Sequence, residues 1–167
     1  LTRAQFCKMV VYAMGAEDEL GLYRTVTVFP DVKPSHWAAG YINMAAKGKK
    51  VISGYPDGLF HPDQTVTTGQ AVTILLRMLG YSDKAGDFTI ADAAGFAQRI
   101  GLFPIAYTGT LTQGDLFEMA ADALSFSYRD GSATVIGRLV SQGTVSRAAA
   151  NALGLLTPAL TARQVAD

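Results

Sequence analysis

The sequence predicts an all-α fold of helix–loop–helix repeats joined by long loops, and two observations support this prediction. Three segments of similar sequence recur along the chain, each beginning with threonine and continuing with apolar residues at helical spacing. A second kind of helical segment precedes the second and third copies, at residues 36–45 and 90–100. Because similar amphipathic helices most simply bury their apolar stripes against one another, we expect a single bundle.

The three copies are TRAQFCKMVVYAMG (2–15), TTGQAVTILLRMLG (67–80) and TQGDLFEMAADALS (112–125). The residue three places after each threonine is Gln or Asp, as in a capping box, where the two residues satisfy each other's free backbone amides. The expected capping pairs are Thr2 with Gln5, Thr67 with Gln70 and Thr112 with Asp115. Each copy is therefore expected to begin a helix at its threonine.

Composition limits the classes of protein to which the chain can belong. Its 167 residues include 14 Lys+Arg and 14 Asp+Glu, and without a cationic surplus we expect no nucleic-acid partner. Hydrophobic residues make up 49%, and a chain of this length buries on folding roughly 70% of the surface that its unfolded form exposes. That is enough for one hydrophobic core. No stretch approaches the about 20 apolar residues that span a bilayer, so we expect no membrane insertion. The start at Leu1, without initiator methionine or signal peptide, is interpreted as a piece cut from a longer protein.

The sequence does not favour an enzyme or a metal site. His36 and His61 have no partner at metal-ligand spacing, and the single cysteine, Cys7, has no second thiol with which to pair. No Walker loop, dinucleotide fingerprint or Gly-x-Ser-x-Gly elbow occurs. We therefore expect no catalytic residue, no metal and no cofactor, and Cys7 is expected to be a small buried hydrophobe.

Several elements of the chain together resemble the S-layer homology (SLH) repeat of bacterial cell-surface proteins. The resemblance lies in Phe29-x-Asp31-Val32, His36-Trp37-Ala38, Tyr41-Ile42, Gly54-Tyr55-Pro56-Asp57-Gly58-x-Phe60-x-Pro62 and a threonine-initiated helix that ends in Leu79-Gly80-Tyr81. Thr2-Arg3-Ala4-Gln5 is similar to the Thr-Arg-Ala-Glu that opens the family's core helix, with Gln in place of Glu.

The resemblance divides the chain into four parts, which we expect to form one compact domain. Residues 1–27 would hold the C-terminal helix of a first repeat and a linker, residues 28–81 a complete repeat, and residues 82–133 a degenerate third repeat. Residues 134–167 are expected to form an additional helical tail. The first helix of this tail could occupy the place of a missing partner helix.

The resemblance implies both a fold and a function. SLH repeats pack in threes around a pseudo-threefold axis, with the threonine-initiated helices at the centre. They anchor exported bacterial proteins non-covalently to cell-wall polysaccharides, commonly ones that bear pyruvate ketals, in grooves between neighbouring repeats. The resemblance therefore implies an extracellular location at the cell wall, a pyruvylated cell-wall polysaccharide as partner, and attachment to the rest of a longer surface protein.

By the same resemblance, at most one groove of this chain is equipped to bind the glycan. The family's arginine, which pairs with the ligand's carboxylate, remains only as Arg3, because its counterparts are the uncharged Thr68 and Gln113. Arginine offers a planar charged fork that matches a carboxylate. In the first turn of a helix it also opposes the helix dipole, which hints at an outside anion. The implied glycan-binding residues are Arg3, Trp37, Gly54, Tyr55, Asp57 and Gly58.

Three of these residues also have a purely structural interpretation. Trp37 is equally expected as a core aromatic, and Tyr55 as a residue that fastens its loop to the core. Asp57 is expected as a turn residue whose carboxylate accepts local amides. The alternative function is accordingly a structural or protein-interaction domain of a surface or secreted protein that has lost glycan binding.

Overall fold

The computed structural model of the chain describes residues 1–107 and 109–156, whose regular secondary structure is helical. The α-helices are α1 (Arg3–Ala13), α2 (Ala39–Asn43), α3 (Thr68–Met78), α4 (Ala93–Arg99), α5 (Gln113–Ser125), α6 (Val135–Ser141) and α7 (Arg147–Ala152). Two short 3-10 helices, η1 (Glu17–Leu22) and η3 (Ile90–Asp92), and one π turn, η2 (Met44–Gly48), adjoin them. Within the described residues extended pairing is limited to isolated bridges, so the predicted all-α class is confirmed.

The three long helices begin at threonines that cap them. The hydroxyl of Thr2 accepts the amide of Gln5 at 3.2 Å, and the side chain of Gln5 accepts the amide of Thr2 at 2.9 Å. The same reciprocal pair opens α3 and α5. Each box satisfies two backbone amides that a helix start would otherwise leave free, which fixes where the helices begin.

The helix expected at residues 36–45 begins three residues later than predicted. The ring nitrogen Nδ1 of His36 accepts the amide of Ala38 at 3.1 Å, and this local bond holds residues 36–38 in a turn before α2 starts. At its other end the helix continues as the π turn η2 to Gly48. A side chain at position 48 would meet the Tyr23 ring, so that glycine allows the turn and the preceding loop to pack closely.

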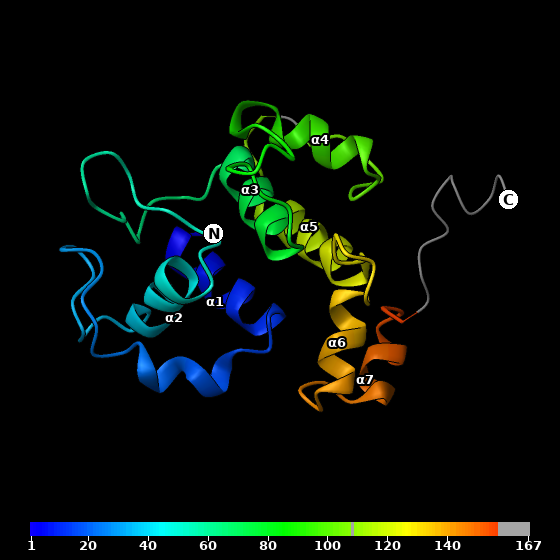
Figure 1. Cartoon of the computed structure of the whole chain (residues 1–167), viewed down its shortest axis with the longest axis horizontal. Helices are drawn as coiled ribbons and strands as arrows, with labels where there is room; N and C mark the ends of the chain where they lie inside the picture. The colour runs from blue at the N-terminus through cyan, green and yellow to red at the C-terminus, as the bar shows by residue number, and fades with distance from the viewer. Residues whose placement is uncertain (108, 157–167) are drawn as a thin grey trace, which may run out of the picture.

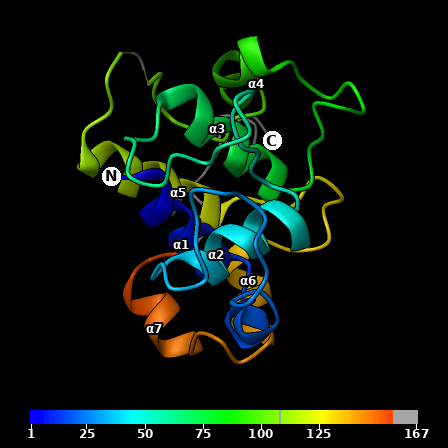
Figure 2. The same ribbon diagram turned by 90° about the vertical axis from the view of Figure 1, so that its left-hand side faces the viewer.

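Three helix pairs organise the molecule. Helix α1 packs against α2, α3 against α4, and α5 against α6. Figure 1 shows α3 and α5 along the middle of the molecule, with α1 and α2 on one side and α6 and α7 on the other. Both views place α4 at one end and α7 at the opposite end (Figures 1 and 2). Helix α6 therefore gives α5 a partner, as α2 does for α1 and α4 does for α3.

The predicted tail contributes two helices, α6 and α7, to this arrangement. Thr134 caps α6 through the amide of Gly137, and Ser146 caps α7 through the amide of Ala149. The remainder of the expected tail, residues 157–167, lies outside the described residues. No helix within the described residues combines the length and the hydropathy needed to cross a membrane.

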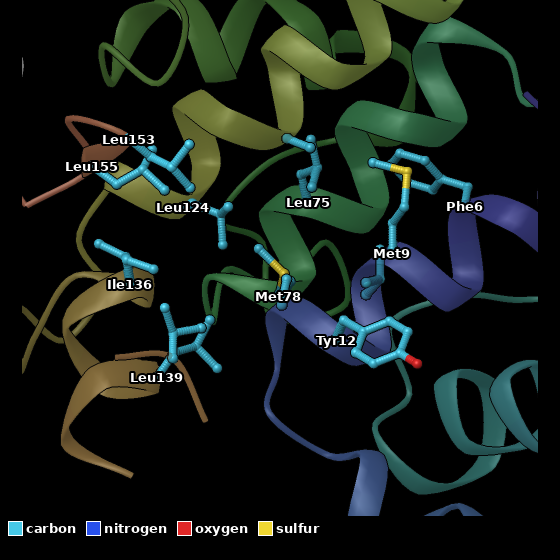
Figure 3. A pocket seen from close by; sticks show the side chains of 14 residues that line it. Phe6, Met9, Tyr12, Leu75, Met78, Leu124, Ile136, Leu139, Leu153 and Leu155 are labelled. Atoms are coloured by element: carbon cyan, nitrogen blue, oxygen red, sulfur yellow. The ribbon is translucent and has the colours of Figure 1, made fainter. Parts of the chain in front are cut away.

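The apolar stripes of α1, α3 and α5 converge without closing completely. Val10, Leu75 and Met119 are buried in a common core. Between α1, α3, α5 and α6 there remains a pocket of about 360 Å³ with an almost wholly apolar wall. Figure 3 shows the side chains that face this space, among them Met78 and Leu139. A sugar would find few partners for its hydroxyl groups there, so this pocket does not suit a polar ligand.

Candidate functional site

Arg3, the first residue of α1, lies in a separate pocket of about 200 Å³. Its walls come from the segment that follows η2, from one face of α3, and from Ile90 of η3. We call it the Arg3 pocket, and it is lined by Arg3, Ile52, Ser53, Gly54, Tyr55, Pro56, Gly69, Gln70, Thr73, Ile74, Arg77 and Ile90. Apolar walls with a few polar groups are typical of sites for small ligands.

The guanidinium of Arg3 is held by two backbone carbonyls and two aromatic rings. Its Nε donates to the carbonyl of Phe60 at 3.0 Å, and its Nη2 donates to the carbonyl of Ser53 at 2.9 Å. Its Cζ lies 4.7 Å from the ring centre of Tyr55 and 4.4 Å from that of Phe60. These contacts leave Nη1 without a protein acceptor among the described residues, so one edge of the fork can receive a ligand.

Arg3 is only 3% exposed, yet it forms no ion pair with any carboxylate of the described residues. Desolvation by burial lowers its pKa, while Tyr55, Cys7 and Asp31 act in the opposite direction. The carboxylate of Asp31 is itself occupied by the backbone amides of Phe60 and His61. A buried charge without a counter-ion is unfavourable. The pocket therefore holds a positive charge without an ion-pair partner among the described residues, and an incoming anion would neutralise it.

Side chains from one face of α3 complete the pocket. Nε2 of Gln70 donates to the hydroxyl of Tyr55 at 2.7 Å, which fixes the aromatic ring beside Arg3. Thr73 is 5% exposed, and its hydroxyl has no hydrogen-bond partner among the described residues. Arg77 is neutralised by Asp83, whose two oxygens accept Nε at 2.9 Å and Nη2 at 3.0 Å. That ion pair also lowers the pKa of Asp83.

Gly54 belongs to the pocket because of a close approach. A Cβ at this position would lie 2.5 Å from a ring carbon of Phe29 and 3.0 Å from the carbonyl oxygen of Leu59. Only glycine allows Phe29 to pack directly behind the wall of the pocket. The structure thus brings Arg3, Gly54 and Tyr55 together in one pocket.

Trp37 lies on another part of the surface and does not line the Arg3 pocket. Its side chain is 56% exposed, with its ring centre 5.9 Å from that of His36 and 6.5 Å from that of Tyr41. Tyr41 in turn lies beside Tyr12 of α1, their hydroxyls 3.4 Å apart. Trp37 is therefore not a core aromatic, and it is separate from Arg3.

Asp57 and Gly58 form the turn outside the pocket. The carboxylate of Asp57 accepts the amide of Leu59 at 2.9 Å and contacts Nε2 of His61 at 2.6 Å. The amide of Leu59 and, after it, His61 lower the pKa of this carboxyl. Gly58 has φ 82°, the left-handed conformation that the turn requires. Both residues shape the loop, and neither lines the Arg3 pocket.

Thr73 and Arg77 are pocket residues that the sequence does not single out. A helical-spacing argument could have found them, because positions 70, 73, 74 and 77 share one face of α3. Within residues 1–107 and 109–156, no group of three or more His, Cys, Asp or Glu side chains is placed to hold a metal ion.

A family model for the S-layer homology domain matches residues 28–72. These residues are an S-layer homology domain. The SLH segment supplies the wall of the Arg3 pocket from Ile52 to Pro56 and the first turns of α3. Arg3 and Arg77 lie outside the matched residues, so the pocket is built where the SLH segment meets its flanks.

Relatives of the chain are bacterial surface proteins by name. The Middle cell wall protein of Brevibacillus brevis is 33% identical over 126 residues, 74% of this chain and 12% of the relative. The Cell surface protein of Thermoanaerobacter kivui is 32% identical over 149 residues, 85% of this chain and 19% of the relative. The Cellulosome-anchoring protein of Acetivibrio thermocellus is 32% identical over 79 residues, 47% of this chain and 17% of the relative.

The chain thus spans less than a fifth of the length of these relatives. Their names agree with the cell-surface location that the sequence predicts. No solved structure matches the chain significantly.

Proposed function

We propose that this chain anchors a longer surface protein non-covalently to the bacterial cell wall by binding an acidic polysaccharide in the Arg3 pocket. The SLH segment and the names of the relatives, which include a cell wall protein and a cellulosome-anchoring protein, support anchoring. The proposed ligand is a cell-wall polymer whose sugar bears a carboxylate, as a pyruvate ketal does. The role is binding, with no chemical step.

The buried, unpaired charge of Arg3 is the observation on which this proposal depends. A ligand carboxylate would approach the free Nη1 edge of the guanidinium and supply the missing counter-ion. Its sugar would lie against the apolar wall formed by Ile52, Pro56 and Ile74.

Calorimetric titration of the chain with a pyruvylated cell-wall saccharide, beside the same saccharide without its pyruvate, tests the proposal. Saturable binding of the pyruvylated form alone is the expected result. Equal affinity for both forms would contradict a role for the acid. No binding at millimolar ligand would contradict glycan binding in this chain.

The alternative is a structural or protein-interaction domain, and one observation favours it. At the positions corresponding to Arg3, α3 and α5 present Thr68 and Gln113, and the hydroxyl of Thr68 donates to the carbonyl of Gly109 at 2.8 Å. Neither of these two helix starts therefore has, at this position, a cationic side chain that could bind a ligand carboxylate. A chain that binds no saccharide in the titration above would support this alternative.

A further inference from the structure

A second polar pocket, of about 270 Å³, adjoins the Arg3 pocket. Ser53 and Arg77 line both, so the two spaces lie on either side of these residues. The second space is lined further by Lys50, Gly80, Tyr81, Ser82, Asp83 and Lys84. The two pockets are therefore neighbours along the segment that follows η2, and we call them together the groove.

The far end of the groove is positively charged. Lys50 and Lys84 are exposed, and neither forms an ion pair with a carboxylate of the described residues. Asp83, the acidic residue that lines this pocket, is occupied by Arg77, and each side chain of that pair is only 13% exposed. The ordered pair forms the boundary between the two pockets, and the two lysines leave an unbalanced positive charge beyond it.

The backbone holds this second pocket in shape. Lys50 has φ 57°, a left-handed conformation uncommon outside glycine, which turns the chain from η2 into the shared wall. On the opposite side, the amide of Ser82 donates to the carboxylate of Asp87 at 2.8 Å, and the hydroxyl of Ser82 accepts the amide of Ala85 at 3.0 Å. These bonds order the turn that presents Lys84.

An aromatic ring also faces the second pocket. Tyr81 lines it, and its ring is fixed by an edge-to-face contact with Phe96 at 5.3 Å between ring centres. Burial raises the pKa of this tyrosine. An apolar ring beside two ammonium groups and a serine suits a sugar that carries an acid group, since rings stack on sugar faces while cations bind the acid.

We propose that this second pocket is a subsite for another acidic sugar unit of the polymer whose first acid binds at Arg3, an inference that rests on the proposed function. One anchored chain would then contact two acids of one polysaccharide strand. Lys50 and Lys84 would neutralise the second acid, and Tyr81 would support its ring. The groove would thereby select a polymer with closely spaced acids over an isolated acidic sugar.

The test compares two saccharides on the full 167-residue chain, one with a single pyruvylated unit and one with two successive pyruvylated units. The test variant is Lys50→Gln/Lys84→Gln, and the matched control is Lys33→Gln/Lys47→Gln, which removes the same charge from exposed lysines outside both pockets. Calorimetry at low and at moderate salt gives the dissociation constants.

The subsite predicts that the two-acid saccharide binds more tightly than the one-acid saccharide. The test variant should weaken the two-acid saccharide roughly tenfold and leave the one-acid saccharide unchanged, whereas the control should change neither. If a second acid adds no affinity, or if both double variants weaken binding equally, the subsite is wrong while the Arg3 site stands. If neither saccharide binds the unsubstituted chain, the subsite and the proposed function both fail.

Discussion

Gln70 and Tyr55 are joined by a hydrogen bond of 2.7 Å from the Gln70 amide to the tyrosine hydroxyl. The same glutamine side chain accepts the amide of Thr67 at 3.2 Å and so caps α3. One residue therefore begins a central helix and positions an aromatic wall of the Arg3 pocket. This coupling links the stability of the helix to the shape of the candidate site.

Gln70→Ala is expected to destabilise the chain more than Gln5→Ala does. Gln5 holds the equivalent position in the capping box of α1, but it has no tyrosine partner. Both changes remove a cap interaction, and Gln70→Ala also removes a hydrogen bond that contributes about 1 kcal/mol. Urea unfolding measures the difference between the two variants. Equal free energies of unfolding would show that the Gln70 to Tyr55 bond adds nothing.

Cys7 predicts a dependence of stability on alkaline pH. It is 1% exposed, and burial raises the pKa of its thiol from 9.0 to about 12. Because the pKa is higher in the folded state, the contribution of the buried thiol to the free energy of unfolding is fully present below pH 9. It is lost as pH rises toward 12. The stability advantage of the unsubstituted chain over Cys7→Ala should therefore shrink above pH 9.

Unfolding free energies of both proteins, measured from neutral pH to about pH 10, test this expectation. Native Cys7 should also resist alkylation at pH 8, because the thiolate is the reactive form and the side chain is enclosed. A pH-independent difference together with rapid alkylation would show that the thiol is accessible in the folded chain.

Trp37 is expected to take no part in binding at Arg3. Because it lies outside both pockets of the groove, Trp37→Ala should change the dissociation constant of the acidic saccharide by less than about twofold. Trp37 is the chain's single tryptophan, so its fluorescence reports on this surface alone. Unchanged emission during the titration is the expected result. A large spectral shift, with much weaker binding by Trp37→Ala, would place the glycan on the Trp37 surface instead.

The helix starts could be predicted from the sequence because their caps are local. The bonds that begin α1, α3 and α5 join residues only three positions apart. The late start of α2 depends on the hydrogen bond from the Ala38 amide to the His36 ring, and the sequence did not lead us to expect this ring as the acceptor. Periodicity predicts that the three apolar stripes meet, but the space left between them depends on how closely the side chains pack.

The candidate site was predictable only in part, because it depends on contacts across the chain. Arg3 meets the carbonyl of Ser53 fifty positions away, and no local pattern specifies that bond. The family resemblance supplies Arg3, Gly54 and Tyr55 for this pocket, and it also supplies Trp37, which lies apart. The burial of Arg3 without a counter-ion is visible only once the fold is known.

Titration of Arg3→Met with the pyruvylated saccharide is the most direct test of the account. Methionine keeps a long apolar side chain but removes the charged fork, so affinity should fall roughly a hundredfold, with Arg3→Lys intermediate. Arg99→Met is the matched control, since Arg99 is 63% exposed and pairs with Asp92 on the surface of α4. It should bind like the unsubstituted chain. If a folded Arg3→Met chain binds the pyruvylated saccharide as tightly as the unsubstituted chain does, Arg3 does not hold the acid and the central claim is wrong.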